Sequence, residues 1–190
     1  NYRTVSTASN VQVRAPINKK SLDGWKNYKV MLEPAMKILN KDNFVKEKFR
    51  FIKNNIFNKA VQFHDSDNVD KAKELYQLCL NNSYNHIDFF LRYGGILFEN
   101  SEYILSLNIY KEGIKIYPES ADLLTNISIV YLMIGEFLEA KKYIEDSLYI
   151  NPNSAHNNSV YACILKGLNQ LSKAKIYSEK SILIDPKNSK

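Results

Sequence analysis

The chain repeats itself with a period of 34 residues, and this repeat constrains its fold more than any other feature. The stretch GEFLEAKKYIEDSLYINPNS is followed by a similar one, NQLSKAKIYSEKSILIDPKNS. A shift of one period places Pro186 on Pro152 and Pro152 on Pro118. Self-similarity at a fixed period indicates stacked units, each too small to bury an apolar core alone. Four units fit without an insertion: 53–86, 87–120, 121–154 and 155–188.

Each unit shows the periodicity of two helices. In the third unit, apolar residues recur every three or four positions in two runs, which indicates two amphipathic helices. The runs are Leu124, Ile127 and Tyr131, then Phe137, Ala140, Ile144 and Leu148. Gly135 lies between them, where a short turn needs a small or turn-forming residue. Proline ends the second helix because it cannot continue the hydrogen-bond ladder.

Small residues recur at three fixed positions of the unit, where they let the axes of packed helices approach closely. They are Ala60, Gly94, Ser128 and Ala162; Ala72, Ser106, Ala140 and Ala174; and Cys79, Gly113, Ser147 and Ser181. The whole chain has six glycines and five prolines, too few for the many turns of a β-sandwich or barrel. The sequence therefore predicts an all-α array of antiparallel helix pairs.

This 34-residue helix-turn-helix resembles the tetratricopeptide repeat (TPR) family over residues 53–188. The resemblance implies a right-handed superhelical solenoid in which the first helix of each unit lines a concave face. It also implies a non-catalytic scaffold for protein–protein interaction. The position where the family usually has Trp or a similar residue is occupied here by Ile56, Phe90, Leu124 and Asn158.

The front of the chain is predicted to be organised differently. Residues 1–20 show no helical stripe and are expected to form an extended basic arm. Residues 21–52 are expected to form capping helices that begin at Ser21, are interrupted at Pro34 and continue from about Asn43. Residues 1–52 contain 11 Lys or Arg and 4 Asp or Glu, a net charge of +7, whereas residues 53–190 sum to −1.

The resemblance places a peptide-binding groove on the concave face. Its predicted polar row is Asn58, Arg92 and Asn126. Asn side chains can hydrogen-bond an extended backbone, and Arg can form a bidentate pair with a carboxylate. The predicted apolar residues are Phe57, Leu91, Ile129 and Met133, which suit a helix or hydrophobic segment unless they belong to the core.

A related mode of binding is not expected. Some TPR domains grip the acidic C-terminus of a chaperone with Lys, Asn and Arg at set positions of the repeat. Those positions hold Phe57, Val61 and Asp122 here, which cannot bind two carboxylates.

No residue pattern predicts catalysis, a cofactor or a metal. The three histidines, His64, His86 and His156, belong to different units, and the two cysteines lack CxxC spacing. We therefore expect no enzyme activity and no small-molecule substrate. Nucleic acid is not an expected partner, because the basic front lacks a dense run of Lys and Arg or an aromatic RNA-binding motif. No apolar run of about 18 residues predicts a membrane helix.

The partner is expected to be a protein segment, either an extended peptide or a helix. Within the family, the chain resembles bacterial pilus-assembly or secretion-associated TPR lipoproteins. That resemblance implies a membrane tether through a missing N-terminus and a location in the periplasm at the outer-membrane inner leaflet. The alternatives are a cytoplasmic TPR co-chaperone or secretion chaperone, and the regulatory TPR arm of a larger enzyme. The apolar outer side of the last helix predicts self-association.

Overall fold

The computed structural model describes residues 43–186, which contain eight helices and no strand. The predicted arm, 1–20, and the 21–42 part of the predicted capping helices lie outside the described residues. The chain divides into two compact units, Asn1–Arg50 and Phe51–Lys190, and the fold described below is that of the second. The helices are α3 (Asn43–Asp65), α4 (Val69–Asn81), α5 (Ile87–Glu99), α6 (Tyr103–Ile116), α7 (Ala121–Met133), α8 (Phe137–Ile150), α9 (Ala155–Gly167) and α10 (Leu171–Ile184).

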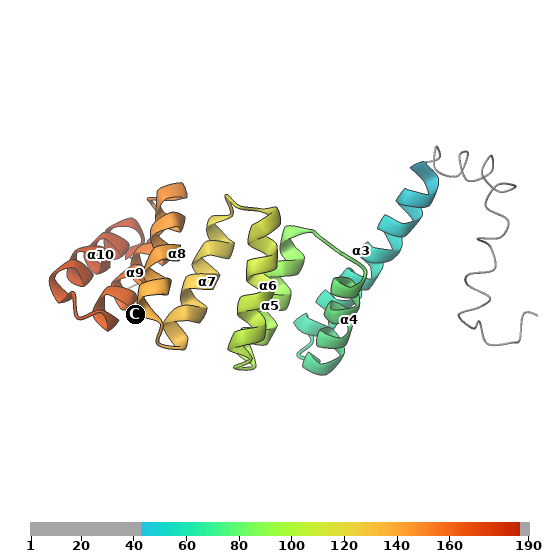
Figure 1. The fold of residues 1–190 in the computed structure, drawn as a ribbon, viewed down its shortest axis with the longest axis horizontal. Coiled ribbons are helices and arrows are strands. Elements are labelled where there is room, and N and C mark those ends of the chain that lie inside the picture. The colour runs from blue at the N-terminus through green and yellow to red at the C-terminus, as the bar shows by residue number, and fades with distance from the viewer. Residues whose placement is uncertain (1–42, 187–190) are drawn as a thin grey trace, which may run out of the picture. The chain divides into compact units, whose positions relative to one another are not determined.

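The helices from α4 onward follow one another side by side (Figure 1). The closest packing is within the pairs α5–α6, α7–α8 and α9–α10, and each pair also contacts the next through α6–α7 and α8–α9. Every connection from α4 onward is short, so consecutive helices run antiparallel. The predicted all-α solenoid of antiparallel helix pairs is confirmed for the described residues.

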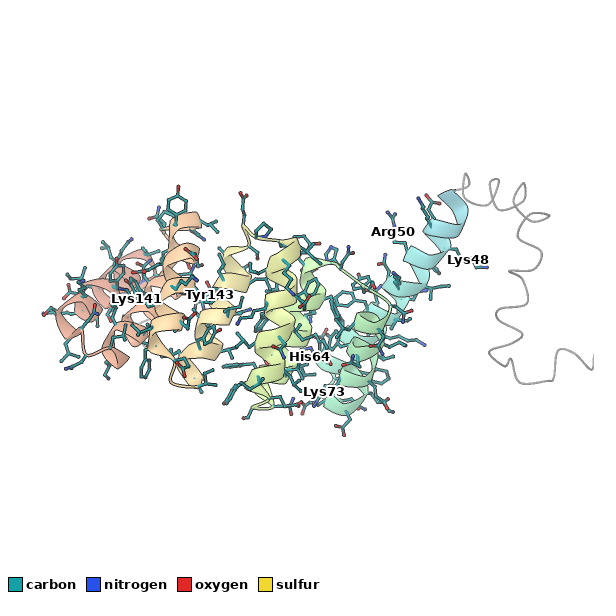
Figure 2. The ribbon with its side chains drawn as sticks, viewed as in Figure 1. Lys48, Arg50, His64, Lys73, Lys141 and Tyr143 are labelled. Atoms are coloured by element: carbon teal, nitrogen blue, oxygen red, sulfur yellow. The ribbon has the colours of Figure 1, made fainter. Side chains whose placement is uncertain are left out.

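The helix α3 begins at Asn43, close to the predicted start of the last capping helix. It is one continuous helix of 23 residues that includes residues 52 and 53, where the capping helices were expected to end and the first unit to begin. No Gly or Pro occurs between Asn43 and Asp65, so no residue in this stretch interrupts the hydrogen-bond ladder. Figure 2 shows the side chains of Lys48 and Arg50 on the N-terminal turns of this helix.

The turns within the pairs have the backbone geometry that the sequence suggested. Gly135 has a φ of 84°, and the residues at the same position of the other units also lie in the left-handed region. These residues are Asp67 (59°), Ser101 (62°) and Asn169 (57°). At the opposite end, α6, α8 and α10 each stop two residues before a proline. The predicted helix-ending signals are therefore confirmed.

Small residues allow the close helix crossings. A Cβ atom added to Gly94 would lie 2.3 Å from the Tyr110 ring, and one added to Gly113 would lie 2.9 Å from Phe90. One added to Gly167 would lie 2.5 Å from the Phe137 ring. At Gly94 and Gly113, which the repeat predicted to be small, α5 and α6 approach too closely for any larger side chain.

The apolar core consists of two clusters. The larger one extends from Phe57 to Val130 and is rich in aromatic rings that contact one another, mostly in tilted or edge-to-face arrangements. The smaller one extends from Ala140 to Ala174, and the α7 residues Ile129 and Leu132 pack against it. The helix α7 therefore contributes to both clusters.

A buried hydrogen-bonded group links α7, α8 and α9. We call Thr125, Ser147 and Asn157 the polar triad; they are 3%, 0% and 5% exposed. Thr125 Oγ1 lies 2.8 Å from Ser147 Oγ and donates to Asn157 Oδ1 at 3.1 Å, and Asn157 Nδ2 donates to Ser147 Oγ at 2.8 Å. Each side chain of the triad is satisfied by the other two, which offsets the cost of burying it.

Asn158 is also fully buried, but it is only partly satisfied. Its Nδ2 donates to the carbonyl oxygens of Ser154 at 2.7 Å and Pro152 at 3.3 Å. Its Oδ1 has no hydrogen-bond partner among the described residues. The helix α9 forms despite this polar residue at a position that is apolar in the other three units.

Candidate protein-binding face

The first helix of each pair presents one exposed stripe. Residues spaced by four, three and four positions share a side of an α-helix. On α3, α5, α7 and α9 this stripe is exposed or partly exposed at every position except Val160. We call it the first-helix face; it consists of Asn54, Asn58, Val61 and Asp65; Asp88, Arg92, Gly95 and Glu99; Asp122, Asn126, Ile129 and Met133; and His156, Val160, Cys163 and Gly167.

Five of the seven predicted binding residues lie on this face. Asn58 and Arg92 are exposed, Asn126 and Ile129 are partly exposed, and Met133 is 53% exposed. Leu91 lies beside the stripe and packs partly buried against the larger apolar cluster.

The position of Phe57 differs from the prediction. It was predicted to line the groove, but its side chain is 8% exposed. Its ring stacks on Tyr84 at a centroid distance of 5.0 Å and lies 6.2 Å from Tyr76. Phe57 therefore belongs to the core between α3 and α4, and it cannot contact a partner without unfolding this part of the structure.

Arg92 pairs with a residue that the sequence reading did not single out. Its Nη1 donates to Asp65 Oδ1 at 3.2 Å, from α5 to α3. The two side chains are 43% and 63% exposed, so the pair contributes at most about 1 kcal/mol to stability. Asp65 lies seven residues after Asn58 on the same stripe, and that spacing was the available sequence signal.

A second polar group joins α3, α4 and α5 beside this pair. His64, at the C-terminal end of α3 (Figure 2), lies with Nδ1 3.2 Å from the hydroxyl of Tyr76 and Nε2 3.7 Å from Glu99 Oε2. Tyr76 is fully buried, and that burial raises its pKa to about 12. Charged and polar groups from three helices thus meet around Arg92.

The first-helix face carries an excess of negative charge. Its carboxylates are Asp65, Asp88, Glu99 and Asp122. Arg92 is the one arginine or lysine among its residues. Asp88 and Asp122 lie in the first turns of α5 and α7, where the helix dipole favours a carboxylate. Neither the charge nor its arrangement was part of the sequence-based expectation.

Within residues 43–186, no group of three or more His, Cys, Asp or Glu side chains could hold a metal ion. No helix in the same range is both long enough and apolar enough to cross a bilayer. Cys79 is buried, and Cys163 is exposed on the first-helix face.

Comparisons with known proteins agree with this architecture. The tetratricopeptide repeat family model matches residues 121–154 and 155–188. No curated protein sequence matches the chain. Among solved structures, MamA 41-end from Desulfovibrio magneticus RS-1 is similar with a TM-score of 0.66 and 12% identity, over 85% of this chain and 97% of that one.

Two further structures have the same fold. PilF of Pseudomonas aeruginosa is 24% identical with a TM-score of 0.62, over 69% of this chain and 60% of PilF. A thermophilic TPR protein of Thermus thermophilus, TTC0263, is 14% identical with a TM-score of 0.60, over 70% of this chain and 75% of that one.

Proposed function

We propose that this chain, whose residues 121–154 and 155–188 match the tetratricopeptide repeat family model, is a non-catalytic scaffold that holds a segment of a protein partner on its first-helix face. The repeats and their structural neighbours support a protein-interaction scaffold as the general function. The observation that carries the proposal is a stripe on α3, α5, α7 and α9 that is exposed or partly exposed at every position except Val160, while other residues of these helices pack into the core.

The side chains of this face suit an extended peptide or a helix. Asn58 and Asn126 can each donate to and accept from a peptide backbone. Ile129 and Met133 supply an apolar contact at the α7 end, and the thioether of Met adapts to differently shaped partners. The proposed partner is therefore a segment with polar backbone contacts to Asn58 on α3 and Asn126 on α7 and an apolar anchor at the C-terminal end of α7.

The proposed setting is the assembly of a pilus or secretion system at the bacterial envelope, with a membrane tether. It follows the sequence resemblance to pilus-assembly and secretion-associated TPR lipoproteins. The presence of PilF among proteins of the same fold is compatible with this setting.

A photo-crosslinking experiment tests the binding face. A photoreactive amino acid replaces Met133 on the first-helix face in one protein and Leu138 on α8 in another; the two positions are 53% and 74% exposed. In cells of the native host, a partner should crosslink at position 133 and not at position 138. Arg92→Ala and Asn126→Ala should reduce that crosslink, and Arg92→Ala should lower the free energy of unfolding by at most about 1 kcal/mol, the contribution of its exposed pair with Asp65. Equal crosslinking at both positions, or no effect of the two substitutions, contradicts the proposal.

Self-association through α10 is a second proposed contact. Leu171, Ile176 and Leu183 are 60%, 60% and 83% exposed on this helix. Leu183→Glu should reduce any self-association measured by sedimentation equilibrium, because it places a charge in an apolar contact. Leu138→Glu is the control, since it changes an equally exposed leucine on α8. An unchanged association constant for Leu183→Glu would exclude this contact.

A further inference from the structure

We propose that the segment held on the first-helix face is basic, with Lys or Arg side chains that lie over α3 and α5. This inference rests on the proposed function and adds the chemical class of the partner to it. It is carried by the distribution of charge on the face and by the ion pair that Arg92 already makes.

The carboxylates of the face are accessible to a partner. The side chains of Asp65, Asp88 and Glu99 are 63%, 58% and 68% exposed, and Asp122 is exposed in the first turn of α7. With Arg92 as the one arginine or lysine, the formal charge of the stripe is −3. Complementary charge steers association and excludes partners of the same sign.

The geometry around Arg92 disfavours an acidic partner. The guanidinium already donates to Asp65, so an incoming carboxylate would have to compete with that side chain. Asp88 and Glu99 lie on the same stripe of α5, four residues before and seven residues after Arg92, and would repel it. An incoming ammonium or guanidinium group meets carboxylates from two helices.

The charge changes along the face. Ile129 and Met133 on α7 and Cys163 on α9 are at least partly exposed and carry no charge. A segment whose basic residues are followed or preceded by apolar ones therefore matches the face over its length. This pattern distinguishes the proposed partner from a uniformly charged polymer.

One basic segment is present in the chain itself. Residues 1–20 contain Arg3, Arg14, Lys19 and Lys20 and no Asp or Glu. A bait without these four charges is therefore included, so that any effect of this basic stretch on peptide binding is controlled for.

The test is a selection from an unbiased library of displayed 12-residue peptides. The full chain is used as the bait, in parallel with a full chain in which Arg3, Arg14, Lys19 and Lys20 are changed to Gln. Enriched peptides should carry net positive charge.

Substitutions of individual carboxylates show which side chains cause the preference for basic peptides. One enriched peptide should bind Glu99→Gln several-fold more weakly, and a variant that combines Glu99→Gln with Asp88→Asn and Asp122→Asn about tenfold more weakly. Its affinity for the unsubstituted bait should also fall with added salt. The control variants Glu74→Gln and Asp146→Asn remove exposed carboxylates from α4 and α8 and should bind normally. Glu99 lies in the last turn of α5, where loss of a negative charge does not weaken the helix.

The outcomes separate this inference from the proposed function. Neutral or acidic enriched peptides whose binding is reduced by Asn126→Ala and Met133→Ala would leave the binding face in place and overturn its preference for basic segments. No enrichment with either bait, or enrichment insensitive to every first-helix-face substitution, would overturn both.

Discussion

Substitution of Gly135 tests how much the left-handed backbone conformation of this turn depends on glycine. Its φ of 84° disfavours a side chain, and no atom lies within 4 Å of where its Cβ would be. Gly135→Ala should therefore destabilise the protein by about 1–2 kcal/mol through backbone strain alone. Gly135→Asn should cost less, because Asn tolerates this region, as Asn169 does in the last unit. Urea denaturation measures both; an equal effect of Ala and Asn would contradict this explanation.

Asn158 offers a stabilising substitution. Its buried Oδ1 lacks a partner among the described residues, and an unsatisfied buried acceptor costs about 1–3 kcal/mol. Leu124 occupies the same position in the preceding unit, so Asn158→Leu should raise the free energy of unfolding by about 1 kcal/mol. Thermal denaturation provides the measurement. A lower melting temperature for the variant would show that the hydrogen bonds of Nδ2 contribute more than the orphaned oxygen costs.

The exposed residues of the proposed binding face were only partly predictable from the sequence, and Phe57 shows why. Repeat position identifies which side of a helix a residue shares with others, and this placed Arg92 and Asn126 correctly on an exposed stripe. It does not reveal how far a helix is rotated toward its neighbours. Phe57 lies one position from Asn58, and that single step takes its ring into the core against Tyr84.

The crossing of α5 and α6 depends on Gly94. A methyl group at this position would overlap the Tyr110 ring, so Gly94→Ala should destabilise the protein by about 1–3 kcal/mol. Gly95 is the matched control, because its added Cβ would meet only the Tyr110 hydroxyl, at 3.9 Å. Gly95→Ala should stabilise by up to about 1 kcal/mol through helix propensity. Equal effects of the two substitutions in chemical denaturation would rule out the close crossing as the cause.

Helix pairs were predictable because their signals are local. The apolar spacing and the terminal prolines lie within one unit and can be counted. The contacts that join units were not predictable in the same way: Arg92 meets Asp65 and His64 meets Glu99 across two helices whose relative rotation the sequence does not specify. The predicted boundary between residues 52 and 53 came from the 34-residue count alone, and α3 runs through these residues because none of them interrupts a helix.

The helical stack as a whole should be sensitive to alkaline pH. Burial raises the pKa of both Tyr76 and Tyr110 to about 12, above the value of 10.0 for an exposed phenol. The folded state therefore retains these protons while the unfolded state loses them, so stability should fall as pH rises from 10 to 12. Each phenol contributes about 2 kcal/mol to this loss.

Two variants identify the source of the alkaline loss. Tyr110→Phe should show a smaller decrease in unfolding free energy between pH 9 and pH 11 than the unsubstituted protein. Tyr149→Phe, which changes a 90% exposed ring, should show the same decrease as the unsubstituted protein. If the unfolding free energy fell equally with pH in all three proteins, the loss of stability at alkaline pH would come from groups other than Tyr110.

The polar triad also bears on how a repetitive chain selects its correct neighbours during folding. Similar units can dock out of order, with α9 placed against α5 and α6 in place of α7 and α8. In that arrangement Asn157 would face Leu91 and Gly113, the counterparts of Thr125 and Ser147, and its amide would be buried without partners. The triad thus raises the free energy of a misordered stack relative to the native one. In this way the sequence favours the native order of the helix pairs.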